Sequence, residues 1–231
     1  MKPRPSFWFR PSVLIFAVVL TVQAAWLTAA ELTRPTLPYF PQNKAEEENA
    51  APTRSAAIIA ASIGLVRGDL WTDAAIALSS GVASNIAGVS TPQMMEPTDQ
   101  ARSIAERAAR LSPHDSRIWL LLATLDSRLN RTPREIANQL KMSYYTGPNE
   151  LALTPLRIRI ATRSTAITDA DLQILVAQEI RTIILHHQDQ KPSILAAYRD
   201  ASPEGKQFIE ATVGDLDKSL LATIRATDNR Q

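Results

Sequence analysis

The chain has 231 residues and a formal net charge of +2, from 25 basic and 23 acidic side chains. Its first 30 residues hold Lys2, Arg4 and Arg10 and no acid, so residues 31–231 carry 22 basic against 23 acidic side chains and offer no basic surface to a nucleic acid. Cysteine is absent, which excludes disulfides, thiolate catalysis and Cys-ligated zinc. The length is enough for one all-helical domain with an N-terminal extension.

Residues 12–30 predict a transmembrane helix. They follow a short basic segment, residues 1–11, and contain no charged side chain. As a helix these 19 residues would extend about 28 Å, close to the hydrocarbon thickness of a bilayer. Basic residues precede the span and few charges follow it. We therefore expect residues 1–11 in the cytoplasm, the span in the inner membrane and the rest of the chain in the periplasm.

Two alternatives remain for this span. Val13–Val22 has the length of the apolar part of a signal peptide, and small residues form a cleavage site near Ala30, so cleavage there would give a secreted or periplasmic protein. A permanent anchor is favoured by Trp8 and Trp26 near the two ends, because tryptophan prefers the membrane–water interface. A buried helix of a soluble protein is the third interpretation.

Residues 31–52 predict a proline-rich linker. Four prolines alternate with polar residues, and Glu46-Glu47-Glu48 has nothing apolar to pack. We expect this linker to be extended or disordered and to hold the domain away from the membrane. Residues 53–231 then form the periplasmic domain, and its patterns predict an all-α fold.

The domain begins with a predicted pair of helices, Arg54–Val66 and Leu70–Val82. Arg67-Gly68-Asp69 joins them, and Trp71 follows as a wedge expected between the two helices. The same tripeptide mediates cell adhesion in unrelated proteins, but a glycine turn followed by an acidic helix cap accounts for it here. Residues 84–96 predict a long loop, either without regular structure or with a short helical turn.

Three central helices are predicted at 98–111, at 115–130 and between Thr132 and Gly147. Ser112-Pro113 ends the first, since the residue before proline avoids the α region. Thr132-Pro133-Arg134-Glu135 starts the third with a capping box and a proline at the first helical position. Along the third helix the expected apolar stripe consists of Ile136, Ala137, Leu140 and Tyr144. Along the second, we expect Arg117, Asp126 and Arg128 to face water.

This central part resembles the tetratricopeptide repeat, a helix–turn–helix unit of about 34 residues. The matching positions are Ala101, Ala105, Ala108, Pro113, Trp119, Leu122 and Ala123. Trp119 follows Ala101 by 18 residues, as it does between successive repeats of that family. Departures include Ala123 in place of a glycine and Asp126 in place of a tyrosine. The resemblance implies antiparallel α-hairpins stacked into an α-solenoid, a tetratricopeptide-like domain.

Further helices are predicted after Gly147. One begins at Thr154 as N-cap with Pro155 at the first helical position, or starts earlier and kinks. The others are Thr168–His187 with Thr168 as cap, Pro192 to about Asp200, and a segment from Pro203 capped by Ser202. Gly214 divides this last segment, which is either one helix or two with Asp217 capping the second. Arg157, Arg159 and Arg163 do not share one helix face, so we expect solvated charges in preference to a site for an anionic ligand.

No residue is assigned a catalytic, cofactor-binding or metal-binding role, and no cofactor is expected. His186 and His187 are adjacent, so on a helix they point about 100° apart and are poorly placed to share a metal. The acid pairs Asp169/Asp171 and Asp215/Asp217 lie where helix caps belong. One ring of Tyr144-Tyr145 is expected in the core, and the other on the surface, where it could serve a partner.

The chain as a whole resembles the single-span, repeat-bearing envelope proteins of Gram-negative bacteria. The resemblance rests on the anchor, the turn at Arg67–Trp71, the pattern from Ala101 to Trp119 and Gly147-Pro148-Asn149-Glu150, which together cover about a third of the chain. It implies a non-enzymatic scaffold that binds an envelope protein partner and is accessory to exopolysaccharide synthesis or export. The alternative is an envelope glycan-binding protein or glycan-processing enzyme, which would need two carboxylates in a cleft.

Overall fold

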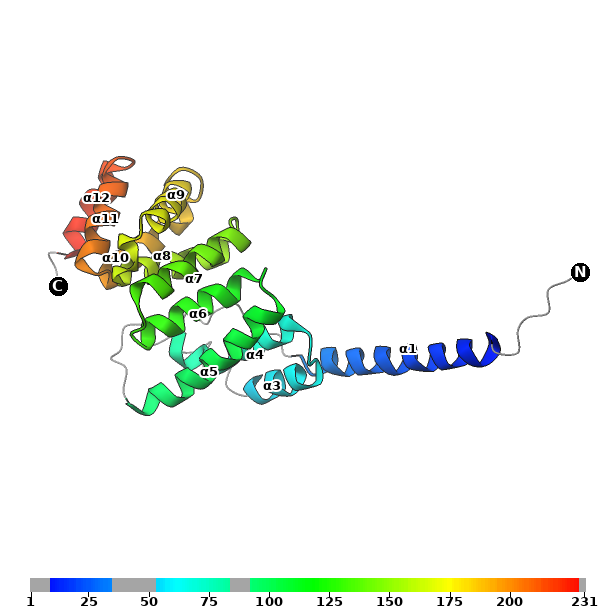
Figure 1. Cartoon of the computed structure of the whole chain (residues 1–231). Helices are drawn as coiled ribbons and strands as arrows, with labels where there is room; N and C mark the ends of the chain where they lie inside the picture. Colours follow the sequence, from blue (N-terminus) through cyan, green and yellow to red (C-terminus); the bar gives the residue numbers. More distant parts are fainter. Residues whose placement is uncertain (1–8, 35–52, 84–91, 229–231) are drawn as a thin grey trace, which may run out of the picture.

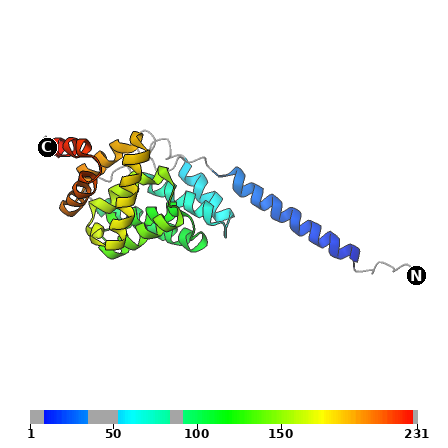
Figure 2. The same cartoon turned by 90° about the horizontal axis from the view of Figure 1, so that it is seen from above.

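A computed structural model describes residues 9–34, 53–83 and 92–228 of this protein. In these ranges the chain forms eleven α-helices and three short 3-10 helices, without a β-strand (Figure 1). The predicted all-α fold class is therefore confirmed. The helices follow one another away from α1, so that the two ends of the chain lie at opposite ends of the molecule (Figures 1 and 2).

Helix α1 (Phe9–Leu32) projects from the other helices as a single rod (Figures 1 and 2). Its segment Pro11–Leu32 has 22 residues and a mean hydropathy of 2.2, and almost none of it is buried. In the described part of the chain, this is the one helix long and apolar enough to cross a membrane. It begins before the predicted residue 12 and ends after the predicted residue 30. The predicted linker therefore starts inside a helix, and its residues 35–52 lie outside the described ranges, as do residues 1–8.

The next five helices pack in chain order, each against its predecessor where the structure describes the connection between them. Their bounds are α3 Thr53–Ile63, α4 Gly68–Ala83, α5 Pro92–Leu111, α6 Ser116–Arg128 and α7 Pro133–Thr146. Helix α5 also packs against α4. It begins six residues earlier than predicted, so residues 92–96 belong to a helix and not to a loop; residues 84–91 lie outside the described ranges.

Small side chains let these helices approach one another closely. Ala101, Ala105 and Ala108 of α5 are fully buried among α4, α5 and α6. At Gly68 a Cβ atom would overlap the side chain of Ser112 at the end of α5. Glycine is therefore required at Gly68 by close helix packing. Gly68 and Asp69 belong to the first turn of α4, so Gly68 does not form the predicted glycine turn, and Asp69 lies inside the helix that it was predicted to cap.

Local capping signals fix several helix ends. Thr132 and Glu135 form both hydrogen bonds of the predicted capping box at α7, and Gly147 ends that helix. Ser202 caps α11 as predicted, by accepting from the N–H of Gly205 at 3.1 Å. Two predicted caps were wrong. Asp169, not Thr168, caps α9, and Thr154 is the first residue of α8 rather than its cap.

The C-terminal elements surround α8. They are η1 Leu151–Leu153, α8 Thr154–Arg163, η2 Thr165–Thr168, α9 Ala170–His186, η3 Gln188–Gln190, α10 Lys191–Asp200, α11 Pro203–Gly214 and α12 Lys218–Asp228. Helix α8 packs against α6, α7, α9, α10 and α11. In a one-dimensional stack each repeat contacts only its neighbours, so these contacts do not establish a regular solenoid. Asp217 caps α12, which makes the segment after Pro203 two helices.

Candidate functional site

A cluster of buried polar side chains lies between α7, α8 and α9. At its centre the carboxylate of Glu179 accepts hydrogen bonds from the hydroxyl of Tyr144 and, at 2.8 Å, from that of Thr154. Nη1 of Arg157 lies 3.9 Å from Oε1 of Glu179. Tyr144 is 5% exposed and Arg157 is fully buried. Three helices therefore meet around one carboxylate and one guanidinium.

Arg157 was predicted to be solvated, and that prediction was wrong. Its Nη2 donates to the carbonyl oxygens of Ser143 at 2.6 Å and Gly147 at 2.9 Å, and its Nε donates to Oγ of Ser143 at 3.0 Å. Its guanidinium also lies over the ring of Tyr144, 4.8 Å from the centroid. The last carbonyls of a helix lack partners within the helix and carry partial negative charge, so the end of α7 stabilises a buried cation.

Burial sets the protonation equilibria of this cluster. Burial raises the pKa of Glu179 above its ordinary value, although the hydrogen bonds from Tyr144 and Thr154 and the charge of Arg157 oppose the shift. Burial also raises the pKa of Tyr144, and the neighbouring Glu179 adds to this rise. Glu179 therefore holds a proton more tightly than a solvated glutamate.

A pocket of about 420 Å³ opens beside this cluster. Leu151 and Leu175 contribute apolar walls, and Asn149, Gln178 and His187 contribute polar groups. Glu179 is the one acid among the described residues that line it. A glycosidase of the usual kind needs two carboxylates about 5–10 Å apart. The described lining of this pocket therefore lacks the acid pair that such a glycosidase uses.

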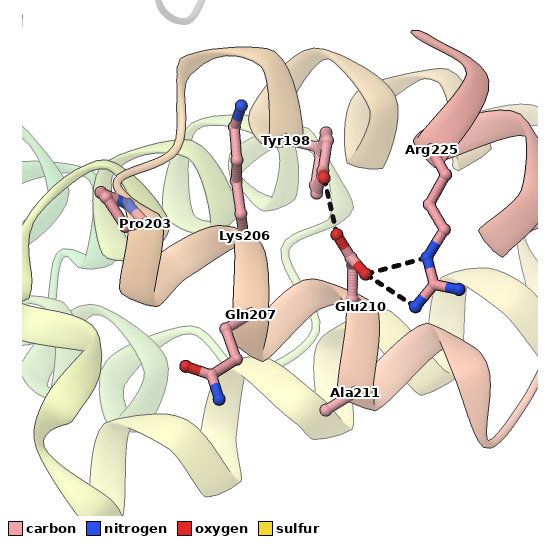
Figure 3. Close-up of a pocket in the computed structure, with 7 residues that line it drawn as sticks. All are labelled: Tyr198, Pro203, Lys206, Gln207, Glu210, Ala211 and Arg225. Atoms are coloured by element: carbon pink, nitrogen blue, oxygen red, sulfur yellow. Dashed lines mark hydrogen bonds and ion pairs between the residues drawn. The ribbon is translucent and has the colours of Figure 1, made fainter. Parts of the chain in front are cut away.

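A second, open pocket of about 540 Å³ lies on α10, α11 and α12 (Figure 3). Figure 3 shows Glu210 between Tyr198 and Arg225. The hydroxyl of Tyr198 donates to Oε1 of Glu210 at 2.7 Å, and Nε of Arg225 donates to Oε2 at 2.9 Å. The ammonium of Lys206 lies 5.2 Å from the centroid of the Tyr198 ring. Both carboxylate oxygens of Glu210 thus hold neighbouring helices together.

A third polar cluster joins the end of α1 to α4. Arg34 contacts Oδ2 of Asp73 through Nη2 at 2.7 Å and Oδ2 of Asp69 through Nη1 at 3.2 Å. Arg67 contacts Oε2 of Glu31 at 2.8 Å. Burial raises the pKa of Asp73 despite Arg34. For Asp69 burial acts in the same direction, but the hydrogen bond and charge of Arg67 outweigh it and lower the pKa. The Arg67-Gly68-Asp69 turn is therefore part of the attachment of α1.

An apolar core and one indole complete this attachment. Ala30 is fully buried in a cluster with Ala57, Ala60 and Leu70 of α3 and α4. Nε1 of Trp26 donates to the carbonyl oxygen of Ile63 at 2.8 Å. The end of α1 therefore packs onto the domain that follows it.

Of the remaining sequence candidates, Tyr144 belongs to the cluster around Glu179 and His187 lines the pocket beside it. His186 is exposed in the last turn of α9, and no group of three or more His, Asp or Glu side chains suited to a metal occurs in the described ranges. Tyr144 is buried and Tyr145 is 63% exposed, which confirms the predicted division of the two rings. Glu179 was missed, although an acid on the apolar face of α9, between Val176 and Ile183, is a signal of a buried polar site.

Known proteins give no further guide to this site. No protein-family model matches the chain, and neither a curated protein nor a solved structure matches it, so the function must be inferred from the geometry.

Proposed function

We propose that this protein is a membrane-anchored scaffold, in which α1 crosses the inner membrane and the helical domain binds an envelope protein on the periplasmic side without bond-making chemistry. The observation that best supports the anchor is the exposure of α1. Its large apolar side chains, among them Leu14, Ile15 and Phe16, are each about two-thirds exposed. Apolar surface of this extent on a helix of spanning length is stabilised by lipid and destabilised by water.

The attachment of α1 supports a permanent anchor over a signal peptide. Cleavage near Ala30 would remove the indole of Trp26 from the carbonyl of Ile63 and would take Ala30 out of the apolar core. A signal peptide is removed from the mature protein, whereas these contacts make the end of α1 part of the folded domain. A secreted form would lose part of its own packing.

The packing of α3 to α7 supports a tetratricopeptide-like domain that acts through surface contact. Successive helices lie against one another in this half, and the small residues expected of such hairpins are buried. Exposed large side chains include Tyr145 of α7 in this half, 63% exposed, and Ile174 of α9 in the C-terminal part, 67% exposed. Such side chains contribute strongly when a protein partner covers them. A role in polysaccharide synthesis or export rests on the sequence resemblance alone.

A glycan-binding protein is the second candidate, and the pocket beside Glu179 favours it. Amide and imidazole groups of Asn149, Gln178 and His187 could hydrogen-bond sugar hydroxyls there. Its single acid argues against the glycan-processing enzyme. Binding of soluble oligosaccharides to the full-length protein in detergent, measured by calorimetry, would distinguish this candidate from the scaffold.

Cysteine labelling in cells tests the anchored topology, because the native chain has no cysteine. Tyr145→Cys and Ser6→Cys variants would be treated with a membrane-impermeant maleimide after permeabilising the outer membrane. We expect labelling of Tyr145→Cys in these cells, whose inner membrane is intact, and of Ser6→Cys only after lysis, with the protein beginning at or next to Met1 by N-terminal sequencing. A mature protein that begins near Glu31, or equal labelling of both variants, would overturn the anchor.

Crosslinking tests the scaffold separately. A photo-crosslinking residue at Tyr145 should trap a defined envelope protein, and the same residue at the exposed Glu204 of α11 serves as the matched control. Equal yields from both positions, or none from either, would contradict a partner surface around Tyr145.

A further inference from the structure

Exposed apolar side chains occur on the elements that meet at the end of α1, which packs against α3. Leu65 and Val66, in the turn between α3 and α4, are 57% and 82% exposed, and Ile59 of α3 is 52% exposed. Leu32, at the end of α1, is 83% exposed. Single exposed apolar residues are ordinary, but here they lie beside the one described helix that can span a membrane.

Several carbonyl oxygens in and beside the same turn accept hydrogen bonds. The N–H groups of Gly64 and Arg67 donate to the carbonyls of Ala60 at 2.9 Å and Gly64 at 2.7 Å. Two indoles from other helices supply two more hydrogen bonds: Nε1 of Trp26 donates to the carbonyl oxygen of Ile63, and Nε1 of Trp71 donates to that of Leu65 at 3.3 Å. A helix end normally leaves such carbonyls to water. Backbone that enters a lipid environment must have them satisfied by the protein.

The length of α1 sets the depth of this turn. A bilayer core needs about 20 helical residues, so a span that begins at Pro11 ends close to Ala30. Trp26 lies four residues before that boundary, about 6 Å inside it at the helical rise per residue. The hydrogen bond from Trp26 holds Ile63 at the same depth. Moving α1 outward to lift Ile63 into water would draw Arg10 into the hydrocarbon, which is unfavourable.

The geometry points to a second membrane contact: the end of α3 and the turn Gly64–Arg67 enter the lipid interface beside α1, with Leu65 and Val66 inserted among the lipids. This inference rests on the proposed anchoring of α1. The ion pairs of Arg34 and Arg67 with Asp73 and Glu31 lie at the junction of α1 with the domain, where lipid headgroups tolerate charge. The domain thus lies on the bilayer surface, with no spacer between them.

Fluorescence of single cysteine variants tests this contact. Full-length Val66→Cys protein, labelled with an environment-sensitive dye, would be reconstituted in phosphatidylethanolamine–phosphatidylglycerol vesicles with a lipid that carries a nitroxide quencher near its headgroup. Ile174→Cys on α9, 67% exposed in the native protein, is the matched control for a surface position. Val18→Cys, 61% exposed in the middle of α1, reports on the anchor itself. For Val18→Cys, a lipid with its nitroxide deep in the acyl chains is used, because this position is expected near the centre of the bilayer.

We expect a blue shift and loss of emission at position 66 with the headgroup quencher, and neither change at position 174. Position 18 should be quenched by the deep nitroxide. Quenching at 18 with none at 66 would overturn the membrane contact while leaving the anchor intact. A blue shift at 66 without quenching would also overturn it, because a protein would then cover the turn. No quenching at 18 would refute the anchor and this inference together.

Discussion

Arg102 of α5 and Asp126 of α6 form an ion pair in which the acid is completely buried. Nε of Arg102 lies 2.5 Å from Oδ1 of Asp126, whose side chain is 0% exposed, whereas that of Arg102 is 20% exposed. Nε2 of Gln139 donates to the other carboxylate oxygen, so Asp126 links α5, α6 and α7. The pair is asymmetric: losing the arginine leaves a charge without water, whereas losing the acid does not.

This asymmetry predicts unequal effects of the two single substitutions. We expect Arg102→Met to lower the free energy of unfolding by about 3–5 kcal/mol, because the buried carboxylate loses its counter-charge. Asp126→Asn should cost about 1–3 kcal/mol, since Arg102 retains Glu106 at 2.6 Å and solvent. Urea unfolding of the detergent-solubilised protein measures both. Glu106→Ala is the control, with a loss of about 1 kcal/mol at most; equal losses for Arg102→Met and Asp126→Asn would contradict the prediction.

Glu179 predicts a pH dependence of stability. Its folded-state pKa is raised above the ordinary value of 4.5, so its contribution to stability is complete below about pH 4.5 and is lost as the pH rises through the raised folded pKa. Glu179→Gln cannot ionise and should not show this loss. We expect the unfolding free energy of the native protein, relative to Glu179→Gln, to fall as the pH is raised from 4.5. A difference that stays constant or grows with pH would refute the assignment.

Arg157 should be far less replaceable than its neighbour on the same helix. We expect Arg157→Lys to destabilise the domain by about 2–4 kcal/mol, because an ammonium cannot reach the carbonyls of Ser143 and Gly147 together with Oγ of Ser143. Arg159→Lys is the control, since Arg159 is 31% exposed and pairs with Asp200 near the surface, and it should cost about 1 kcal/mol or less. Denaturant titration of the two variants checks the difference in order and size.

Two glycines of α11 predict different effects on stability for the same substitution to alanine. A Cβ at Gly205 would overlap the carbonyl oxygen of Thr162, which already accepts from the N–H of Ser202 at 3.0 Å and so cannot retreat. We expect Gly205→Ala to cost about 1–3 kcal/mol by pushing α11 away from α8. At Gly214 the nearest atom would be Cδ2 of Leu221 at 3.3 Å, so Gly214→Ala should be close to neutral. Thermal unfolding followed by circular dichroism measures both; a destabilised Gly214→Ala would argue against this packing.

The sequence was most informative where a structure depends on residues close in the chain. The capping box of Thr132 and Glu135 spans four residues and formed as predicted. The stripe of Ile136, Ala137, Leu140 and Tyr144 is buried, because helical periodicity alone decides which residues share a face. The helical character of the domain followed from many such local signals.

Sequence reasoning failed where burial depends on a partner helix. Asp126 lies on the polar face of α6 when that helix is considered alone, and Arg102, 24 residues earlier, makes the position an interior one. Arg157 was assigned to water on the same reasoning, although the carbonyls that bind it belong to α7. Glu179 was passed over because its apolar neighbours explained α9 without it. The candidate site therefore emerged only from tertiary contacts.

The contacts of Trp26, Ala30 and Arg34 attach the end of α1 to α3 and α4 at three points, so we expect α1 and these helices to move as one unit. If α1 crosses a bilayer, its tilt from the bilayer normal therefore sets the tilt of the whole domain. A thicker or thinner membrane changes the tilt of a spanning helix. A change of lipid composition that alters the bilayer thickness would then change the orientation of Tyr145 and of the Glu179 pocket relative to the membrane.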